Sequence, residues 1–232
     1  MQQRNVLLHY HIFKNAGTTF ERVLDENYGD GHIKFDGPFS FSVIIQDQLS
    51  TIIQRHPNAM ACSSHQIHLP APSATQYRPI PVVFIRHPLL RIRSVFLFSK
   101  RSDEKVLDKL TRSDPLEGLE EWVIQKLSGD QNLLQISNLQ TSMLSRCYNL
   151  PPKREGREGR VHFDLQLAVN NLSVVPCLGR VEYFDTDVSS FTETLAKCGL
   201  PFSYTKREAE NVSSPDYKNT VGLKIVGEGV QT

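Results

Sequence analysis

The sequence predicts an α/β protein with a mostly parallel sheet flanked by helices, and three observations lead to this class. Short runs rich in Val, Ile and Leu alternate with longer segments whose apolar residues recur at helical spacing. The chain opens with a strand pattern, a glycine-bearing turn and a helix pattern, as phosphate-binding α/β domains do. The run Pro81–Ile85 is apolar throughout, which is typical of an interior parallel strand covered on both faces.

Each element follows from a local pattern of apolar residues and of breakers such as proline and glycine. In chain order, the expected strands are residues 5–11, 60–63, 81–85 and 174–181. The expected helices are residues 18–26, 44–56, 88–99, 116–127, 133–144 and 188–195. The expected loops are residues 29–40, 66–81 and 151–160. Gly199 is expected to end the last helix.

The length and composition fit one globular domain over residues 1–232, with an exposed loop at 151–160 and a weakly patterned tail at 201–232. Hydrophobic residues make up 39% of the chain and charged residues 22%, so the chain needs neither disulfides nor metal to fold. Four cysteines occur without a CxxC or a zinc-ligand spacing, and we expect buried free thiols, with two disulfides as the alternative.

No signal peptide pattern and no apolar run of about 18 residues occurs in the chain. We therefore expect a soluble, cytoplasmic protein without a transmembrane segment, and a removed N-terminal anchor is the alternative. The oligomeric state is left open by the sequence.

The net charge is small but unevenly distributed. A formal charge of +1 at pH 7 argues against nucleic acid as a partner. Residues 48–102, however, hold seven basic and no acidic residues. Residues 1–47 hold four basic and six acidic residues, and residues 103–232 hold fifteen basic and nineteen acidic ones. An acid-free, arginine-rich quarter favours a site for a small anion.

A first candidate anion site begins at Lys14. Small residues let the backbone approach an anion, and the N–H groups that open the following helix point toward it. The residues expected to contact a phosphate are Lys14, Asn15, Ala16, Gly17, Thr18 and Thr19. The chain has no Gly-Lys pair, so the segment is not a Walker A loop. The alternative is a strand-to-helix turn with a threonine N-cap and a solvated lysine.

A second basic motif follows the strand at 81–85. Ligands of open α/β sheets bind at the carboxyl ends of the strands, and Arg86 there could hold a phosphate through two parallel hydrogen bonds. Ser94 lies about two turns into the next helix and could face the same site. For Arg86 the alternative is a salt bridge to that helix, and Arg91 and Arg93 are expected on the solvated surface.

Taken together, the two motifs resemble those of sulfotransferases of the carbohydrate type, which includes heparan sulfate 2-O- and 6-O-sulfotransferases and bacterial relatives. Residues 11–20, HIFKNAGTTF, match nearly throughout the family motif that binds the 5′-phosphosulfate of 3′-phosphoadenosine 5′-phosphosulfate (PAPS). Residues 86–94, RHPLLRIRS, match the motif that binds the 3′-phosphate. Weaker similarities at 138–141 and 178–185 extend the resemblance over residues 5–200.

Three residues depart from the family pattern, and none of them removes a group that the chemistry needs. Phe13 stands where proline is usual, Asn15 where threonine is commoner and His87 where aspartate is commoner. His87 is expected to pack beside Arg86 rather than to take part in chemistry.

The resemblance implies a P-loop-NTPase-like fold and transfer of the sulfuryl group from PAPS to a hydroxyl of a carbohydrate-like acceptor. The nucleotide product would be 3′-phosphoadenosine 5′-phosphate (PAP). Lys14 would stabilise charge on the bridging oxygen, and Arg86 and Ser94 would bind the 3′-phosphate. This scheme requires no metal, and neither nucleic acid nor a membrane is expected as a partner.

An acceptor hydroxyl also needs a general base. His65 follows the short strand at 60–63, at about the place of a catalytic histidine in the resembling 2-O-sulfotransferases. His68 and a carboxylate elsewhere are the alternatives. His9 and His11 are expected to pack within the sheet. Two other functions stay open, a P-loop-like nucleotide kinase and a non-catalytic nucleotide-binding member of the fold.

Overall fold

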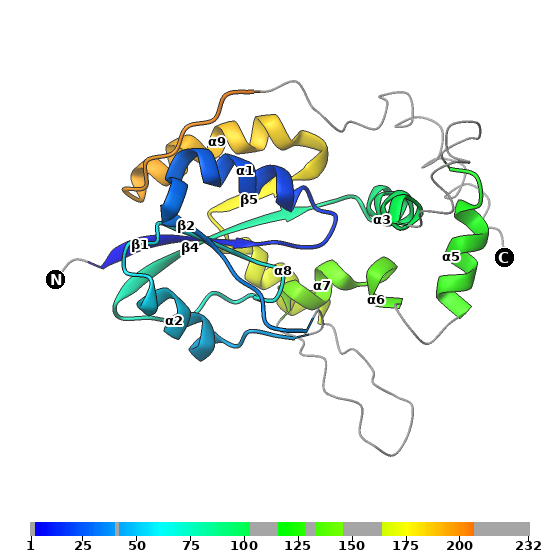
Figure 1. Cartoon of the computed structure of the whole chain (residues 1–232), viewed down its shortest axis with the longest axis horizontal. Helices are drawn as coiled ribbons and strands as arrows, with labels where there is room; N and C mark the ends of the chain where they lie inside the picture. The colour runs from blue at the N-terminus through cyan, green and yellow to red at the C-terminus, as the bar shows by residue number, and fades with distance from the viewer. Residues whose placement is uncertain (1–2, 40–41, 103–115, 129–132, 146–163, 207–232) are drawn as a thin grey trace, which may run out of the picture.

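A five-stranded, all-parallel sheet flanked by helices forms the protein, as the computed structural model shows (Figure 1). The structure describes residues 3–39, 42–102, 116–128, 133–145 and 164–206. The strands lie in the order β2-β3-β1-β4-β5. They are β1 (Arg4–Tyr10), β2 (His32–Lys34), β3 (Ala61–Ser64), β4 (Tyr77–Ile85) and β5 (Cys177–Arg180). The helices are α1 (Gly17–Tyr28), α2 (Gln46–Arg55), α3 (Pro88–Ser102), α5 (Leu119–Ser128), α6 (Leu133–Ile136), α7 (Leu139–Leu144), α8 (Leu165–Ser173) and α9 (Phe184–Lys197). The expected fold class is confirmed at this level.

The central strand β1 supplies apolar side chains to both faces of the sheet. Leu7 packs on one face with residues of α1 and α9, among them Phe20 and Phe191. Val6 and Leu8 point to the opposite face, since successive side chains of a strand alternate. Figure 1 shows α1 and α9 on one side of the sheet and α2 and α8 on the other.

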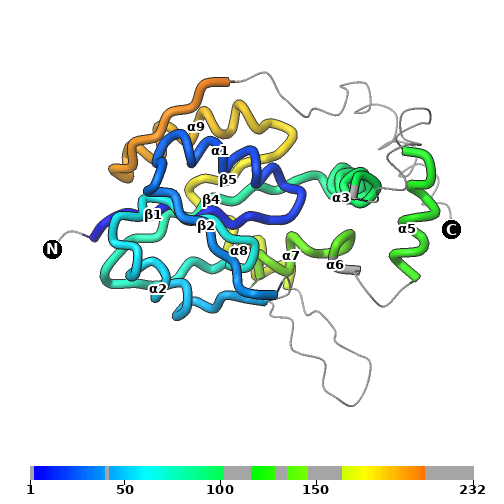
Figure 2. The backbone as a smooth tube through the Cα atoms, in the orientation of Figure 1, coloured from blue at the N-terminus to red at the C-terminus, as the bar shows by residue number. Residues whose placement is uncertain are grey.

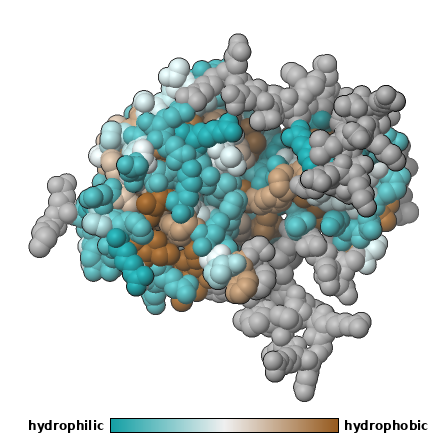
Figure 3. Space-filling model, viewed as in Figure 1, coloured by the Kyte–Doolittle hydropathy of each residue, from teal (hydrophilic) through white to brown (hydrophobic). Residues whose placement is uncertain are grey.

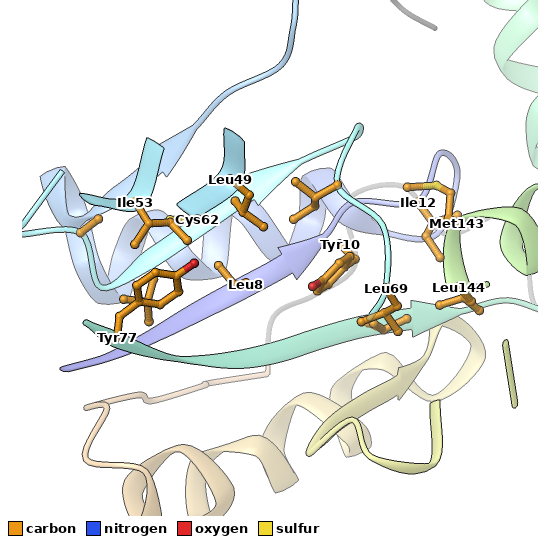
Figure 4. Packing of buried hydrophobic residues seen from close by; sticks show 14 of the residues in the cluster. Leu8, Tyr10, Ile12, Leu49, Ile53, Cys62, Leu69, Tyr77, Met143 and Leu144 are labelled. Atoms are coloured by element: carbon orange, nitrogen blue, oxygen red, sulfur yellow. The ribbon is translucent and has the colours of Figure 1, made fainter. Parts of the chain in front are cut away.

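The second face of the sheet is filled by large, fully covered side chains. Figure 4 shows Leu8 and Tyr10 of β1 beneath Leu49 and Ile53 of α2, with Met143 of α7 beyond them. Each such side chain contributes roughly 1.5–3 kcal/mol by leaving water. This packing fixes the direction of β1 and hence the place where its carboxyl end emerges.

Several expected boundaries need correction. The loop expected at 29–40 contains the edge strand β2, which has only three residues and therefore leaves no periodic pattern. The loop expected at 66–81 ends early, because β4 already begins at Tyr77. Among the described residues β5 pairs only with Val82–Ile85 of β4, so Pro79 and Pro81 precede the part of β4 that has strands on both sides.

The helix expected at 133–144 is wrong as a single element. It is divided into α6 and α7, because Asn138 adopts a left-handed conformation with φ of 56°. Helix α8 was not expected. By contrast, Gly199 ends α9 with φ of +67°, as expected.

Of the cysteines, Cys62 and Cys177 are buried free thiols, as expected, whereas the free thiol Cys198 is partly exposed, and Cys147 lies outside the described residues. The loop expected at 151–160 and the tail beyond residue 206 also lie outside them. Within the described chain no helix is both long and apolar enough to cross a membrane.

Three helices lie beyond the carboxyl ends of the strands. The backbone tube shows α3, α5 and α6 gathered on that side (Figure 2), and the three helices contact one another. The face in Figure 3 is largely hydrophilic, with hydrophobic areas between the hydrophilic ones. The loops that leave β1, β3 and β4 therefore meet helices on the side where α/β sheets bind ligands.

Candidate functional site

The loops that follow β3, β1 and β4 lie next to one another at the carboxyl edge of the sheet. Tyr10, the last residue of β1, is paired with Ser64 of β3 and with Val83 of β4. His65 and Arg86 each follow directly on one of these neighbouring strands. The chain leaves β1 toward β2 on one side, whereas β4 lies on the other side. Such a reversal of strand order is where open α/β sheets form a ligand site.

The loop after β1 has an unusual backbone. Lys14 and Ala16 both adopt left-handed conformations, with φ of 65° and 60°. Such conformations are uncommon for residues with a Cβ, and they gather at functional sites. Ala16 is the N-cap of α1, and among the described residues no side chain caps this helix and no acidic residue occupies its first turn. An uncapped helix N-terminus of this kind suits an anion.

Two arginines hold this loop by its carbonyl oxygens. Nη1 of Arg86 donates to the Lys14 oxygen at 3.0 Å, and Nε of Arg91 donates to the Phe13 oxygen at 3.1 Å. Nη1 of Arg91 also donates to the Gln135 oxygen at 2.7 Å, which ties α3 to α6. The expectation of a solvated Arg91 is therefore wrong, because only 3% of the residue is exposed. Burial, and then Arg86, lower the pKa of Arg91 to about 10, which leaves it charged at neutral pH.

The side chain of Gln140, on α7, joins the loops after β1 and β4. Its Oε1 accepts a hydrogen bond from the Arg86 backbone N–H at 2.8 Å and another from Nδ2 of Asn15 at 2.7 Å. Its Nε2 donates to the Arg86 carbonyl oxygen at 3.0 Å. Nδ2 of Asn15 donates as well to the Phe84 oxygen at 2.7 Å. The buried Asn15 side chain thus shapes the loop from inside, and its expected contact with a cofactor stays a prediction.

The amine of Lys14 lies over an aromatic ring of α3. Its Nζ is 4.6 Å from the centroid of Phe98 and 5.9 Å from that of Phe13, and these two rings meet edge to face at 5.4 Å. Phe13, which departs from the family motif, therefore packs against the Phe98 ring over which the Lys14 amine lies. Burial lowers the pKa of Lys14, and the charges of Arg86 and Arg101 lower it further. A negative charge beside the amine would offset this repulsion, so the surroundings of Lys14 suit an anion.

His65 lies against His11 at the start of the same loop. The two ring centroids are 3.7 Å apart and the ring planes differ by 33°. Nδ1 of His65 is 2.8 Å from the His11 carbonyl oxygen, and its backbone N–H donates to Oδ1 of Asp36 at 2.9 Å. Since a carbonyl oxygen only accepts, Nδ1 carries the proton and Nε2 of the neutral ring has the lone pair of a base. Burial lowers the pKa of His65, and His11 lowers it further, so the ring is neutral at pH 7.

Further hydrogen bonds continue beneath these rings. Nδ1 of His11 is 2.7 Å from Oε1 of Glu21. His9 and His32 share the hydroxyl of Ser63, at 3.0 and 2.8 Å. Ring nitrogens of His9 and His11 and a carboxylate oxygen of Glu21 lie within 4.8 Å of one another. Because hydrogen bonds already engage each residue, we interpret the group as a hydrogen-bonded cluster rather than as metal ligands. His9 and His11 are buried, as expected.

Gly17 is required by the His11 ring. A Cβ at this position would lie 1.8 Å from Cδ2 and 2.1 Å from Nε2 of His11, far inside van der Waals contact. The sequence motif explains this glycine by its approach to an anion. The structure adds a second reason, which is the close packing of helix α1 on the histidine cluster.

The remaining expected site residues lie on α1, on α3 and in the loops after β3 and β4. Thr18 and Thr19 are exposed in the first turn of α1, and Ser94 is half-buried on α3. His68 is half-buried, and burial lowers its pKa to about 4, which makes it a weaker base than His65. His87 is exposed.

The sequence missed the partners that organise the site. Glu182, which follows β5, accepts from the His87 backbone N–H at 3.3 Å and lies 3.8 Å from Nε of Arg86. Arg86 thus has a carboxylate neighbour after β5, and its expected contact with a phosphate stays a prediction. Gln140 and Glu182 fall in the segments 138–141 and 178–185, which resemble the sulfotransferase family more weakly. This weak resemblance was the only indication of these residues in the sequence. Glu21 left no such signal, because its role depends on the position of His11.

Comparisons with known proteins add one relative. A protein of Archaeoglobus fulgidus described as an uncharacterized protein is 26% identical over 234 residues, which cover 96% of this chain and 86% of that protein. No family model matches the chain, and no solved structure matches it.

Proposed function

We propose that the protein is a sulfotransferase that moves the sulfuryl group of PAPS to a hydroxyl of a carbohydrate-like acceptor. One observation carries the proposal. The two motifs that resemble the phosphosulfate and 3′-phosphate motifs of that family are joined to each other by Arg86, Lys14 and Gln140. To bind one nucleotide, both motifs must lie side by side. The two motif loops follow the neighbouring strands β1 and β4, so they are adjacent. The parallel sheet with helices on both faces agrees with the P-loop-NTPase-like fold that the resemblance implies.

In this proposal the loop after β1 receives the 5′-phosphosulfate. The N-terminus of α1 and the hydroxyls of Thr18 and Thr19 would hold the phosphate, and Lys14 would stabilise charge on the bridging oxygen as it leaves. Arg86, whose guanidinium carries five donors, would contact the 3′-phosphate as well as the Lys14 carbonyl, with Ser94 beside it. The chemistry needs no metal, and PAP is the product.

His65 would take the proton of the acceptor hydroxyl. Its Nε2 has the lone pair, because Nδ1 is held by the His11 carbonyl oxygen. The acceptor oxygen attacks sulfur in line with the departing phosphate, so its O–H bond breaks while the new O–S bond forms. His65 receives that proton, and the bond from sulfur to the bridging oxygen breaks.

Transfer of label from ³⁵S-PAPS to a panel of desulfated polysaccharides and simple hydroxyl acceptors tests this function. We expect label in at least one acceptor, and we expect Lys14→Ala to lower the rate by about 10²–10³-fold, because a charge at the leaving oxygen is lost. Lys197→Ala, which removes an exposed lysine of α9, is the matched control and should keep the rate. A Lys14→Ala variant that transfers sulfate at the native rate would reject the mechanism.

The nucleotide kinase and the non-catalytic member of the fold give other results in the same assay. Magnesium-dependent turnover of ATP without transfer from PAPS would favour the kinase. Binding of PAP without transfer to any acceptor would favour the non-catalytic protein. Both basic motifs retain their charged residues, which favours the transferase over either alternative.

A further inference from the structure

The carboxylate of Glu21 is linked to the exposed His65 through a single residue, His11. Glu21, on the second turn of α1, contacts Nδ1 of His11 at 2.7 Å, and the other side of the His11 ring faces His65 at 3.7 Å between centroids. The side chains of His11 and Glu21 are 7% and 17% exposed. His11 is thus the most buried of the three residues, and it contacts both the exposed His65 and the partly exposed Glu21.

The hydrogen bonds determine which nitrogen of each ring carries a proton. Nδ1 of His65 faces a carbonyl oxygen and Nδ1 of His11 faces a carboxylate oxygen, and neither partner can donate when Glu21 is ionised. In both neutral rings the proton is therefore on Nδ1 and the lone pair on Nε2. A further proton can enter the stack only at an Nε2.

Two imidazolium rings cannot share this stack easily, because like charges at this separation repel strongly inside a protein. The charge of Glu21 opposes this repulsion and raises the pKa of His65, so the carboxylate stabilises a proton on that ring. Burial raises the pKa of Glu21, but its hydrogen bond with His11 and the charges around it lower the pKa overall, so that the carboxylate stays ionised.

We propose that Glu21 is a positioning residue whose negative charge, acting through His11, enables His65 to accept the proton of the acceptor hydroxyl. The inference rests on the proposed transferase function. In the transfer step the acceptor O–H bond breaks, its proton binds Nε2 of His65, and the new O–S bond replaces the bond from sulfur to the departing phosphate oxygen. Glu21 loses and gains no proton, and its charge offsets that of the imidazolium.

Other charged groups also face the stack. Asp36, after β2, receives the His65 backbone N–H and, like Glu21, raises the pKa of His65. His9, on β1, stacks on His11 at 5.3 Å and has a pKa well below its usual value, because it is buried and lies near other histidines. Lys34, on β2, lowers the pKa of Glu21. Removing the charge of Glu21 alone leaves all of these in place, so its effect can be isolated.

The test is an NMR titration of the histidine ring resonances in the native protein and in Glu21→Gln. Glutamine can still accept the hydrogen bond from His11, but it has no charge. We expect the His65 midpoint to fall by about one pH unit or more, since a neighbouring opposite charge shifts a pKa by about 1–3 units. Glu21→Asp keeps the charge and should titrate closer to the native protein. Glu193→Gln, which removes an exposed carboxylate of α9, should titrate as the native protein does.

An unchanged midpoint in Glu21→Gln would overturn the inference. If that variant does not fold, Glu21→Asp decides, because its shorter side chain draws the carboxylate away from His11 and should lower the His65 midpoint, though by less than loss of the charge would. A native His65 midpoint in folded Glu21→Asp would then overturn the inference. The titration needs neither donor nor acceptor, so it can fail or succeed separately from the transferase assay. Where transfer is measured, the acidic limb of the kcat profile should move to lower pH in Glu21→Gln, with kcat reduced and the KM for PAPS unchanged.

Discussion

At the residue scale, Gly17 shows how one position can serve two requirements. The sequence motif predicts a glycine where the backbone approaches an anion, and the structure places the His11 ring where a Cβ would stand, 1.8 Å away. Any side chain at position 17 must therefore displace His11 and with it the contacts to His65 and Glu21. The glycine couples helix α1, whose N-terminus is proposed to bind the nucleotide, to the histidines proposed to face the acceptor.

Gly17→Ala should therefore destabilise the protein by about 1–3 kcal/mol, the usual cost of overpacking a tight interior site. Urea unfolding followed by circular dichroism measures this change. Gly31→Ala is the matched control, because the nearest atoms to a Cβ there are 3.6 Å away. Equal stability of the two variants would show that the His11 ring does not restrict position 17.

Residue identity alone predicted part of the site. Lys14, His65 and Arg86 stand out in the sequence because their types suit the chemistry and because a family motif contains them. The inward roles of Arg91 and Asn15 could not be predicted, since either side chain is as compatible with a solvated surface as with a buried carbonyl partner. Contacts across more than sixty residues of chain, such as Arg91 with Phe13, depend on how the strands pair.

At the scale of elements, α7 acts as the link between the two motif loops. Its Gln140 accepts from Asn15 and Arg86 and donates back to the Arg86 oxygen, so one side chain fixes the spacing of both loops. The left-handed Asn138 that separates α6 from α7 sets the start of this helix. A periodic apolar pattern passes through residues 133–144 without a break, and for this reason the sequence predicted one helix there.

Gln140→Ala should weaken PAP binding by about tenfold and lower stability by about 1–3 kcal/mol, because buried donors and acceptors lose their partners. Isothermal titration with PAP and urea unfolding measure the two effects. Gln166→Ala, on the exposed side of α8, is the control, since its side chain hydrogen-bonds to Asn170 of the same helix. Native PAP affinity in Gln140→Ala would mean that the loops keep their spacing without this side chain.

The elements that carry strong patterns were predicted well, and those that lack a pattern were not. β1 and β4 contain the apolar runs that a parallel sheet requires in its interior, and the shorter β3 and β5 lie within segments that the sequence also predicted as strands. β2 has three residues at the sheet edge and could be recognised only from its pairing with β3. The sequence did not predict the start of β4, because Pro79 and Pro81 are untypical of a strand. The strand accommodates them because β5 pairs only with the later residues Val82–Ile85.

At the scale of the whole molecule, the uneven charge of the chain acquires a structural meaning. The acid-free residues 48–102 supply two of the three loops at the carboxyl edge of the sheet, with His65 in one and Arg86 in the other. Part of this positive charge is turned inward, since Arg86 and Arg91 hold carbonyl oxygens of the loop after β1. A small net charge is therefore compatible with a compact anionic cofactor at one edge of the sheet.

The central claim is that one nucleotide with phosphates at both the 3′ and 5′ positions occupies the loops after β1 and β4. Isothermal titration of the native protein with PAP, 5′-AMP and ATP tests it most directly. We expect PAP to bind at least about tenfold more tightly than 5′-AMP, because a charge-assisted hydrogen bond to the 3′-phosphate contributes about 1.5–3 kcal/mol. ATP with magnesium should bind more weakly than PAP. Equal affinity for PAP and 5′-AMP, or preferred binding of ATP, would contradict the account.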